Sequence, residues 1–361
     1  MKPVSPPRIR ENVSLLRHHT FRLDVRARYF AEIRSPEELQ HVTGGRLRPG
    51  RLLILGRGAN LLFSGDFDGL VLKMELLGKR VVSEDSESVL LDVAAGEDWP
   101  RLVTNVVRRG WGGIENLALV PGTVGAAPVQ HIAAYGHNLR DVFVSLEAVS
   151  VKDGTTRRFS RDDCGFGYRE SVFRRELRGA YVITSVRFRL DKHPALNTSY
   201  RSRYESLEDE LAKVAREPYG VRDVYNAVVA IRRRKLPDIR RVGTAGSFFK
   251  NPEVSRDRYL ALSRSLPGLP FHPVGELSYT VPGSAAAPVQ DRVRVPAGWL
   301  IDQLGWKGKR VGHCGLWPQQ ALTVVNYGGA SPQEVLDLVE SIREAFLREY
   351  DIALENEVEV V

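Results

Sequence analysis

A glycine-rich loop close to the N-terminus restricts the folds that this chain can adopt. The loop, Gly56–Leu61, follows a strand-like segment at 51–55 and begins like a dinucleotide-binding fingerprint. Leucine stands at the third glycine position, and the residues after it do not start an amphipathic helix. The loop therefore does not predict a Rossmann fold with a pyrophosphate at a helix N-terminus. Its unshielded backbone amides could still bind an anion, and a tight turn between two strands is the competing interpretation.

A second loop of small residues favours a bound ligand. Pro121–Pro128 contains two glycines and two alanines, and Thr123 carries its only polar side chain. Such a segment lets a diphosphate approach the backbone amides. The apolar stretch that follows, Gln130–Gly136, could cover a flat ring. Two separated loops of this kind suit a long, bent ligand, and a dinucleotide cofactor is the natural candidate.

Hydrophobic periodicity and turn signals favour an α+β fold over a doubly wound sheet. Strands are more numerous than a regular alternation with helices would give. An Asp-Gly pair at 153–154 predicts a hairpin, and Ser331, Pro332 and Glu334 predict a capped start for the last helix. The stretch 267–296 carries no periodicity and is predicted to be a long loop. We predict strands at 51–55, 69–73, 88–94, 146–151, 155–159, 180–190 and 352–361, and helices at 99–110, 207–216, 221–235 and from 332 onward.

Composition and charge limit the classes of function. The chain has 361 residues, 43% hydrophobic and 27% charged, which is typical of a globular protein with two or three domains. Its apolar runs are far below the ~18 residues of a transmembrane helix. The first residues lack the apolar core of a secretory signal, so we expect a cytoplasmic protein without a membrane partner. Two cysteines are too few for a disulfide framework, and the net charge of +8 fits either a nucleic-acid surface or pockets for small polyanions.

Five blocks of sequence resemble one enzyme family. Gly113–Gln130, followed by Ala134-Tyr135-Gly136, is similar to the flavin-binding core of the UDP-N-acetylenolpyruvoylglucosamine reductases, and the other four blocks resemble further motifs of that family in the same order. They are Cys164–Ser171, Gly246–Pro252, Ala297–Gln303 and Leu354–Val358. The resemblance implies a two-subdomain FAD-binding domain of the vanillyl-alcohol-oxidase (PCMH) type and an α+β substrate-binding domain. The implied division is 20–192 for the FAD-binding domain, split near 82, a linker and substrate loop at 193–222, the substrate-binding domain at 223–350, and a C-terminal strand at 351–361 with the catalytic glutamate.

The resemblance also implies a reaction. NADPH reduces FAD, and the reduced flavin passes a hydride to the enolpyruvyl double bond of the UDP-sugar, giving UDP-N-acetylmuramate for peptidoglycan precursor synthesis. Some flavoproteins of this fold bind FAD covalently through a His or Cys in the first loop, which this chain lacks, so non-covalent FAD is expected. We expect a monomer that binds no nucleic acid. The alternatives are another flavin oxidoreductase of the same fold and, from a different class, a basic nucleic-acid-binding protein.

By the same resemblance, three residues carry the chemistry. Ser247 matches the family's proton donor, and a well-placed hydroxyl suffices for a driven proton donation. Arg169 matches an active-site arginine, whose planar fork suits a carboxylate, and Glu357 matches the glutamate that helps to polarise the enol intermediate. From residue type alone, the serine could cap a turn, the arginine could form a surface ion pair, and the glutamate could belong to a solvent-facing row with Glu355 and Glu359.

The other site residues are also implied by the resemblance. Tyr204 would cover the substrate, with Tyr200 as a competitor for that role. The run 232–235 is the best nucleic-acid candidate, but four consecutive helical residues cannot share one face and no aromatic residue is interleaved. His131 stands where an asparagine is common and Glu359 where an arginine is expected, and no metal site is predicted. The expected FAD contacts are Gly56, Arg57, Gly58, Ala59, Asn60, Leu61, Pro121, Gly122, Thr123, Gly125, Ala126, Tyr135 and Gly136, and the expected substrate contacts are Tyr204, Arg232, Lys235, Asn251 and Gln320.

Overall fold

The N-terminal part of the chain forms a small mixed sheet. The computed structural model describes residues 5–44, 50–201, 205–274 and 291–361. Helix α1 (Pro36–Val42) beside this sheet begins at Ser35, whose side chain accepts a hydrogen bond from the Glu38 amide. In order across the sheet, the strands are β1 (Arg10–Ser14), β2 (Arg26–Ile33), β5 (Phe67–Met74) and β3 (Leu52–Leu55). Strand β5 runs parallel to both of its neighbours, and the expected strands at 51–55 and 69–73 are confirmed.

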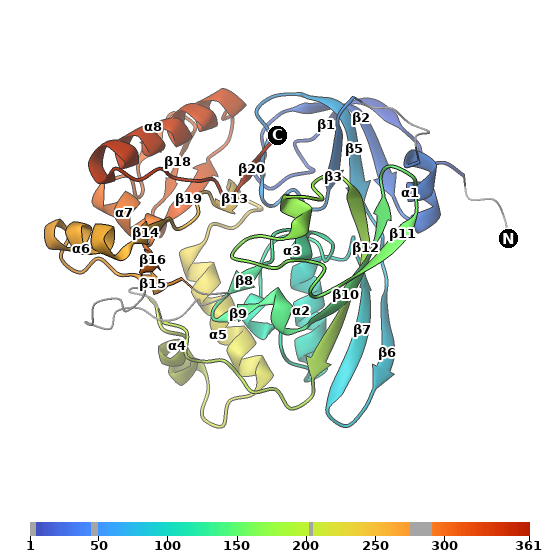
Figure 1. Ribbon diagram of the computed structural model, residues 1–361, viewed down its shortest axis with the longest axis horizontal. Coiled ribbons are helices and arrows are strands. Elements are labelled where there is room, and N and C mark those ends of the chain that lie inside the picture. The colour runs from blue at the N-terminus through green and yellow to red at the C-terminus, as the bar shows by residue number, and fades with distance from the viewer. Residues whose placement is uncertain (1–4, 45–49, 202–204, 275–290) are drawn as a thin grey trace.

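A second sheet, entirely antiparallel, stands beside the first (Figure 1). In order across it, the strands are β11 (Thr156–Ser160), β10 (Phe143–Ser150), β12 (Tyr181–Asp191), β7 (Ser88–Ala94) and β6 (Lys79–Glu84). The hairpin of β10 and β11 turns at the expected Asp-Gly pair, where Gly154 has φ +74°. The change from the first sheet to the second falls between Met74 and Lys79, slightly before the expected split near 82.

The chain between β7 and β10 contains one longer helix and otherwise little regular structure. Helix α2 (Trp99–Arg108) buries the predicted apolar face, which includes Trp99, Val103 and Val107. After it the chain forms only short elements among the described residues, so backbone groups remain available to shape a loop. These elements are α3 (Ala126–Val129), β8 (Ala133–Ala134), β9 (His137–Asn138) and 3-10 turns at Glu115–Leu117 and Leu139–Asp141; a third 3-10 turn, Val172–Arg174, precedes β12.

Helices α4 (Leu207–Val214) and α5 (Val221–Lys235) belong to the core of the second sheet. Val224 and Ile231 of α5 are fully buried and lie in the same apolar cluster as Trp99 of α2. The core therefore changes after α5 rather than before it. The expected start of the substrate-binding domain, residue 223, falls inside α5, and the expected linker at 193–222 contains α4.

The C-terminal region is a second α+β unit, drawn in orange and red at the left of Figure 1. Residues 275–290 of the expected loop at 267–296 lie outside the described residues, and the described ends of that segment contribute two short strands to the unit. The predicted capping box of its last helix is confirmed. In order, the main sheet has β13 (Gly243–Ser247), β19 (Gln320–Asn326), β18 (Cys314–Trp317) and β17 (Arg310–Val311), and the small sheet has β14 (Glu253–Ser255), β16 (Arg292–Arg294) and β15 (His272–Pro273). The helices are α6 (Arg256–Ser265), α7 (Ala297–Gln303) and α8 (Pro332–Tyr350).

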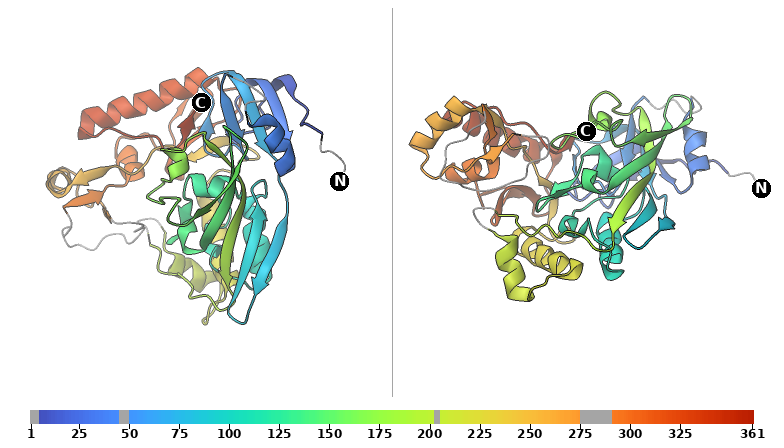
Figure 2. Two further views of the ribbon diagram at one scale, coloured as in Figure 1. Left: turned by 45° about the vertical axis from the view of Figure 1, so that its right-hand side comes forward. Right: turned by 60° about the horizontal axis from the view of Figure 1, so that its bottom comes forward.

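The last residues connect the two halves of the molecule. Strand β20 (Glu359–Val360) pairs in parallel with β4 (Leu61–Leu62), directly after the first glycine-rich loop. It is much shorter than the strand predicted at 352–361. Both views of Figure 2 show the C-terminus at the junction between the C-terminal unit and the two sheets. Within the described ranges, no helix is long and apolar enough to cross a membrane.

Candidate active site

The two glycine-rich loops pack directly against each other. A Cβ atom added to Gly56 would lie 2.5 Å from Thr123 Oγ1, so the loops can approach this closely only because the first has no side chain there. Asp98 contacts both loops. Its carboxylate accepts hydrogen bonds of 2.9 and 2.6 Å from the Arg57 guanidinium, and its backbone forms a β-bridge with Thr123. We call this joined pair of loops the cradle.

A cavity of about 310 Å³ is bordered by the cradle. All of the FAD contacts expected in the two loops line it: Gly56, Arg57, Gly58, Ala59, Asn60 and Leu61 from the first, and Pro121, Gly122, Thr123, Gly125 and Ala126 from the second. Their side chains are mostly small, which leaves backbone amides accessible to a diphosphate. Tyr135 and Gly136 do not line this cavity; Gly136 contacts Asn197, whose Nδ2 donates to the Gly136 carbonyl at 3.0 Å.

A larger cavity of about 1250 Å³ adjoins the first and shares Arg57, Pro121 and Gly122 with it. Three side chains that line the larger cavity have a buried polar atom without a hydrogen-bond partner in the described part of the chain. These atoms are His19 Nδ1, Arg232 Nε and Thr323 Oγ1. Because buried polar atoms are nearly always paired, three around one cavity indicate a ligand rich in polar atoms. The cradle and this cavity together fit a dinucleotide such as FAD.

Tyr135 and Arg232 interact at the edge of this site. Tyr135 is 7% exposed, and burial raises the pKa of its hydroxyl, against the opposing effect of the Arg232 charge. Burial likewise lowers the pKa of Arg232, and its hydrogen bond with Tyr135 opposes that shift. The ring of Tyr200 meets that of Tyr135 edge-on, with centroids 5.0 Å apart. Tyr204 lies outside the described residues, so of the two competing tyrosines the structure locates Tyr200.

Contacts connect the segments that carry the three expected catalytic residues, where the two halves of the molecule meet. Arg169 Nε lies 2.9 Å from Glu357 Oε1, and Arg169 Nη1 donates to the Ala133 carbonyl at 3.0 Å. The Arg169 and Glu357 side chains are only 20% and 16% exposed, so theirs is not a surface ion pair. Ser247 ends β13, and the carbonyl of the next residue, Phe248, accepts the Glu357 amide at 2.8 Å. Arg169 and Glu357 thus pair from distant segments, and the strand end that carries Ser247 is joined to Glu357 through the backbone of Phe248. We call these three expected catalytic residues the catalytic cluster.

The C-terminal glutamates do not form a uniform solvent-facing row. The Glu355 side chain is 76% exposed, Glu359 is 34% exposed, and Glu357 is the most enclosed at 16%. Glu359 lines the smaller cavity and pairs with Arg178 at 2.6 Å. The local environment therefore selects Glu357 as the partner of Arg169, in agreement with the motif register.

Two residues that support the catalytic cluster were not singled out for this role by the sequence. Asn60 Nδ2 and Arg174 Nη2 each donate to the Glu357 carbonyl at 3.0 Å. Arg174 Nη1 also donates to the Arg169 carbonyl at 3.4 Å. Asn60 belongs to the first loop, so a residue of the cradle contacts the cluster directly. No local signal marks Arg174, because its partner at 357 is 183 residues away along the chain.

His131 connects the second loop to the turn that carries Arg169. It is fully buried, its Nδ1 lies 2.6 Å from the Gly167 carbonyl, and its ring stacks on Phe166 with centroids 4.7 Å apart. Since a carbonyl only accepts, Nδ1 must carry the proton. Burial lowers the pKa of the imidazole, more than its hydrogen bonds raise it. The histidine found where an asparagine is common thus provides a buried hydrogen bond between the two regions.

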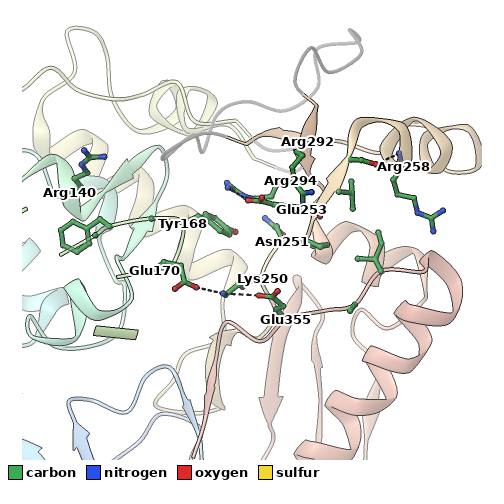
Figure 3. A pocket seen from close by; sticks show the side chains of 18 of the residues that line it. Arg140, Tyr168, Glu170, Lys250, Asn251, Glu253, Arg258, Arg292, Arg294 and Glu355 are labelled. Atoms are coloured by element: carbon green, nitrogen blue, oxygen red, sulfur yellow. Dashed lines mark hydrogen bonds and ion pairs between the residues drawn. The ribbon is translucent and has the colours of Figure 1, made fainter. Parts of the chain in front are cut away.

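The expected substrate contacts do not line one common cavity: Asn251 and Arg232 line different cavities, and Lys235 and Gln320 line none of the three described here. A third cavity, of about 1140 Å³, opens between the two halves of the molecule (Figure 3), and Asn251 lines it while accepting the Ala297 amide at 3.0 Å. Arg232 lines the 1250 Å³ cavity instead. Lys235 pairs with Glu205 at 2.9 Å, and Gln320 begins β19, near Gly298. We call the third cavity the cleft.

Comparison with known proteins identifies the family. A family model described as the C-terminal domain of UDP-N-acetylenolpyruvoylglucosamine reductase matches residues 238–361, and one described as a FAD binding domain matches 27–160. A curated UDP-N-acetylenolpyruvoylglucosamine reductase of Flavobacterium johnsoniae is 38% identical, over 98% of this chain and 99% of its own. Its namesake in Pseudomonas aeruginosa is 42% identical, over 97% and 98%. The chain belongs to the UDP-N-acetylenolpyruvoylglucosamine reductase family.

The fold of this reductase agrees with its family. A crystal structure of UDP-N-acetylenolpyruvylglucosamine reductase from Thermus caldophilus shares the fold, with a TM-score of 0.65 and 24% identity over 98% of this chain and 99% of that one. The expected fold class, a PCMH-type FAD-binding domain with an α+β second domain, is confirmed. The reductase is a flavin-dependent oxidoreductase, and FAD is its cofactor. Among the described residues, no group of three or more His, Cys, Asp or Glu could hold a metal ion.

Proposed function

We propose that this reductase uses NADPH to reduce the enolpyruvyl group of UDP-N-acetylenolpyruvoylglucosamine, giving UDP-N-acetylmuramate for peptidoglycan synthesis. It acts as a monomer with non-covalent FAD. The substrate is the one that the names of its relatives carry. When bound, the flavin supplies the hydride. The protein has to orient the enolpyruvyl group, stabilise negative charge that builds toward its carboxylate, and protonate the adjacent carbon.

The ion pair between Arg169 and Glu357 is the observation that carries this proposal. The guanidinium offers donors in a planar fork, which suits a substrate carboxylate, and the 2.9 Å contact with Glu357 fixes the plane of that fork. Both side chains are largely removed from solvent, so their charges act more strongly on a developing enolate than they would in water. The Arg169 guanidinium therefore favours negative charge on the substrate, and Glu357 contributes by holding the guanidinium in place.

Ser247 is well placed to supply the proton. Its hydroxyl forms no hydrogen bond with another described residue, so it remains available to a ligand, and the residue is half-buried. Thr323, which lies directly opposite it on β19, lines the 1250 Å³ cavity that fits the cofactor. The strand pair β13–β19 therefore borders the cofactor site, and a proton from Ser247 would reach a substrate that lies next to the flavin.

A three-step spectroscopic titration tests the proposal. The visible spectrum of the purified protein should show bound flavin, anaerobic NADPH should bleach it, and the enolpyruvyl UDP-sugar should then restore it. Bleaching that the UDP-sugar cannot reverse, while another acceptor can, would identify a different flavin oxidoreductase of this fold. A protein without flavin absorbance would overturn the proposal. Acid precipitation should release the colour into the supernatant, because the attachment is non-covalent.

A further inference from the structure

Lys250 joins two segments across the cleft. Its ammonium lies 2.8 Å from Glu170 Oε1 and 3.4 Å from Glu355 Oε2, and Figure 3 shows it between the two carboxylates. The Lys250 side chain is 19% exposed and that of Glu170 is 28% exposed, whereas Glu355 is 76% exposed. The contact with Glu170 is both shorter and better shielded, so it is the stronger of the two.

We call the ion pair between Lys250 and Glu170 the bridge, and each of its ends lies close in sequence to a residue of the catalytic cluster. Glu170 follows Arg169 directly, and Lys250 lies three residues after Ser247. Glu355, the other carboxylate beside Lys250, is two residues from Glu357. A displacement of either end would therefore move a residue that acts on the substrate.

Backbone hydrogen bonds already hold two of these three segments together. The Lys250 amide donates to the Glu355 carbonyl at 2.9 Å, and the Glu357 amide donates to Phe248 at 2.8 Å. The ammonium adds little between segments that are joined in this way. Its distinctive contact is the one with Glu170, which belongs to the other half of the molecule.

Contacts from the C-terminal unit hold the turn at 167–170, and Lys250 makes one of them. Others are the ion pair between Arg169 and Glu357 and the contact of Arg294, whose guanidinium lies 3.9 Å from the centre of the Tyr168 ring. The turn's own backbone hydrogen bonds of 3.0 and 3.3 Å join Gly167 and Glu170 to each other and not to the C-terminal unit. Within it Arg169 adopts φ +56°, a left-handed conformation that costs a non-glycine residue of order 1–3 kcal/mol and persists only where the surroundings impose it. Without Lys250, Glu170 has Arg175 as its remaining charged partner, at 3.7 Å and on its own side of the cleft.

We propose that Lys250 is a positioning residue for the catalytic cluster. By holding Glu170, its ammonium sets the turn that carries Arg169 against the strand end that carries Ser247. This inference rests on the proposed function, because it concerns the step in which substrate is reduced and protonated. Because Lys250 lines the cleft, the alternative is that it only binds substrate. In that case its loss would alter substrate affinity rather than the rate of the chemical step.

Single-turnover kinetics of the FAD-loaded Lys250→Met enzyme test the proposal. We expect reduction by NADPH to stay within about 2-fold of the wild type, and reoxidation at saturating UDP-sugar to slow by about 10- to 100-fold, as for a reacting group misplaced by about 1 Å. The apparent dissociation constant of the UDP-sugar should change by less than about 3-fold. Lys250→Arg should recover most of the rate, since it keeps the charge. Weaker substrate binding at an unchanged maximal rate would overturn the proposal.

The partner residue provides a second, independent measurement. Glu170→Gln should slow reoxidation to a similar extent, and the double variant should be no slower than Lys250→Met alone, because the two residues act through one contact. Double-variant losses equal to the product of the single losses would contradict the bridge. If Lys250→Met does not fold, the Glu170→Gln kinetics alone decide the question: an unchanged rate refutes positioning.

Two further variants complete the design. Lys307→Met removes an ion pair of 3.2 Å with Asp302, with exposures of 30% and 28%, away from the residues that line the cleft, and should leave both half-reactions unchanged. Ser247→Ala separates the inference from the function on which it rests. Reoxidation that survives Ser247→Ala contradicts the proposed function, whereas reoxidation that is lost in Ser247→Ala but kept in Lys250→Met contradicts only the role of Lys250.

Discussion

The cradle and the catalytic cluster are built from different parts of the polypeptide. The cradle consists of backbone from two continuous stretches, and its shape depends on a missing side chain, as at Gly56. The cluster consists of side chains from distant segments, such as Arg169 and Glu357, 2.9 Å apart. A site made of backbone should tolerate changes in polarity and fail when atoms are added. A site made of charged and hydroxyl side chains should fail when a proton or a charge is removed, even if nothing is added.

The largest effect is expected from Ser247→Ala, which removes a proton donor and adds no atoms. Reoxidation by the UDP-sugar should slow by about 10²- to 10⁴-fold, the usual contribution of general acid catalysis, while NADPH reduces the flavin at the normal rate. Stopped-flow absorbance of the flavin measures the two half-reactions separately. The control is Ser341→Ala on the exposed surface of α8, which should change neither. Equal losses in both half-reactions would assign Ser247 to the cradle instead of the cluster.

Gly56→Ala is the complementary test of the cradle, because it adds one methyl group and removes no polar atom. That methyl would meet Thr123 Oγ1 at 2.5 Å, and Thr123 is only 3% exposed, so the loops must separate. Overpacking costs about 1–3 kcal/mol, which predicts a loss of FAD affinity of roughly 10- to 100-fold. Fluorescence quenching of added FAD gives the affinity of the apoprotein.

Two variants sharpen the Gly56 result. Gly65→Ala is the matched control, since its methyl would meet nothing within 4 Å, and it should leave FAD affinity unchanged. In the double variant Gly56→Ala/Thr123→Ala the colliding hydroxyl is gone, so affinity should recover in part. Affinity that falls further in the double variant would mean that the Thr123 hydroxyl matters more to FAD than the space between the loops.

The same difference explains what could be predicted from the sequence. The cradle lies in continuous motifs, so the sequence predicts two loops of small residues that suit a dinucleotide, because glycine and alanine leave backbone amides accessible. The individual FAD contacts are implied by the resemblance to the family. The cap of α8 at Ser331 was also predictable, since a capping box is a contact between residues three apart. The cluster was assigned only through resemblance to a family. From residue type alone Arg169 and Glu357 looked like surface groups, because their pairing depends on the tertiary fold.

The features that the sequence does not predict depend on contacts between residues far apart in the chain. Alternation at 352–361 predicted a long strand, but only β20 pairs, because the preceding residues bind to the segment after Ser247 through isolated backbone contacts. The periodicity of α5 indicates its apolar face and not the partner of that face, so the sequence alone does not reveal that α5 packs into the core of the second sheet. Arg174 and Lys250 carried no signal for their positioning contacts, since their partners lie far away in sequence.

Thr323→Val tests whether the strand pair β13–β19, which lies between the two regions, contributes to FAD binding. The Thr323 hydroxyl is fully buried and unpartnered among the described residues, and valine has nearly the same shape. If bound FAD pairs with this hydroxyl, FAD affinity should fall by about 5- to 10-fold, the worth of one hydrogen bond. The apoprotein should become more stable, because an unsatisfied buried group has been removed. Thr184→Val, whose hydroxyl donates to the Glu147 carbonyl at 3.1 Å, should instead destabilise the apoprotein. Unchanged FAD affinity in Thr323→Val would remove this residue from the cofactor site.

The smallest effect concerns pH and His131, the side chain that joins the cradle to the turn of Arg169. Burial lowers the pKa of His131 below the ordinary 6.5, so as the pH falls below about 6.5 the unfolded chain takes up a proton that the folded protein refuses. The free energy of unfolding must therefore decrease from pH 7 to 5.5, by up to about 1 kcal/mol for this residue. His131→Asn keeps a donor for the Gly167 carbonyl at 2.6 Å but cannot titrate, so its urea midpoint should fall less over this range than that of the wild type. The buried His19 and the half-buried His18 and His272, whose pKa values are also lowered, titrate in both proteins and cancel in the difference. Identical pH dependence in the two proteins would show that His131 is not held neutral by the contact between the two regions.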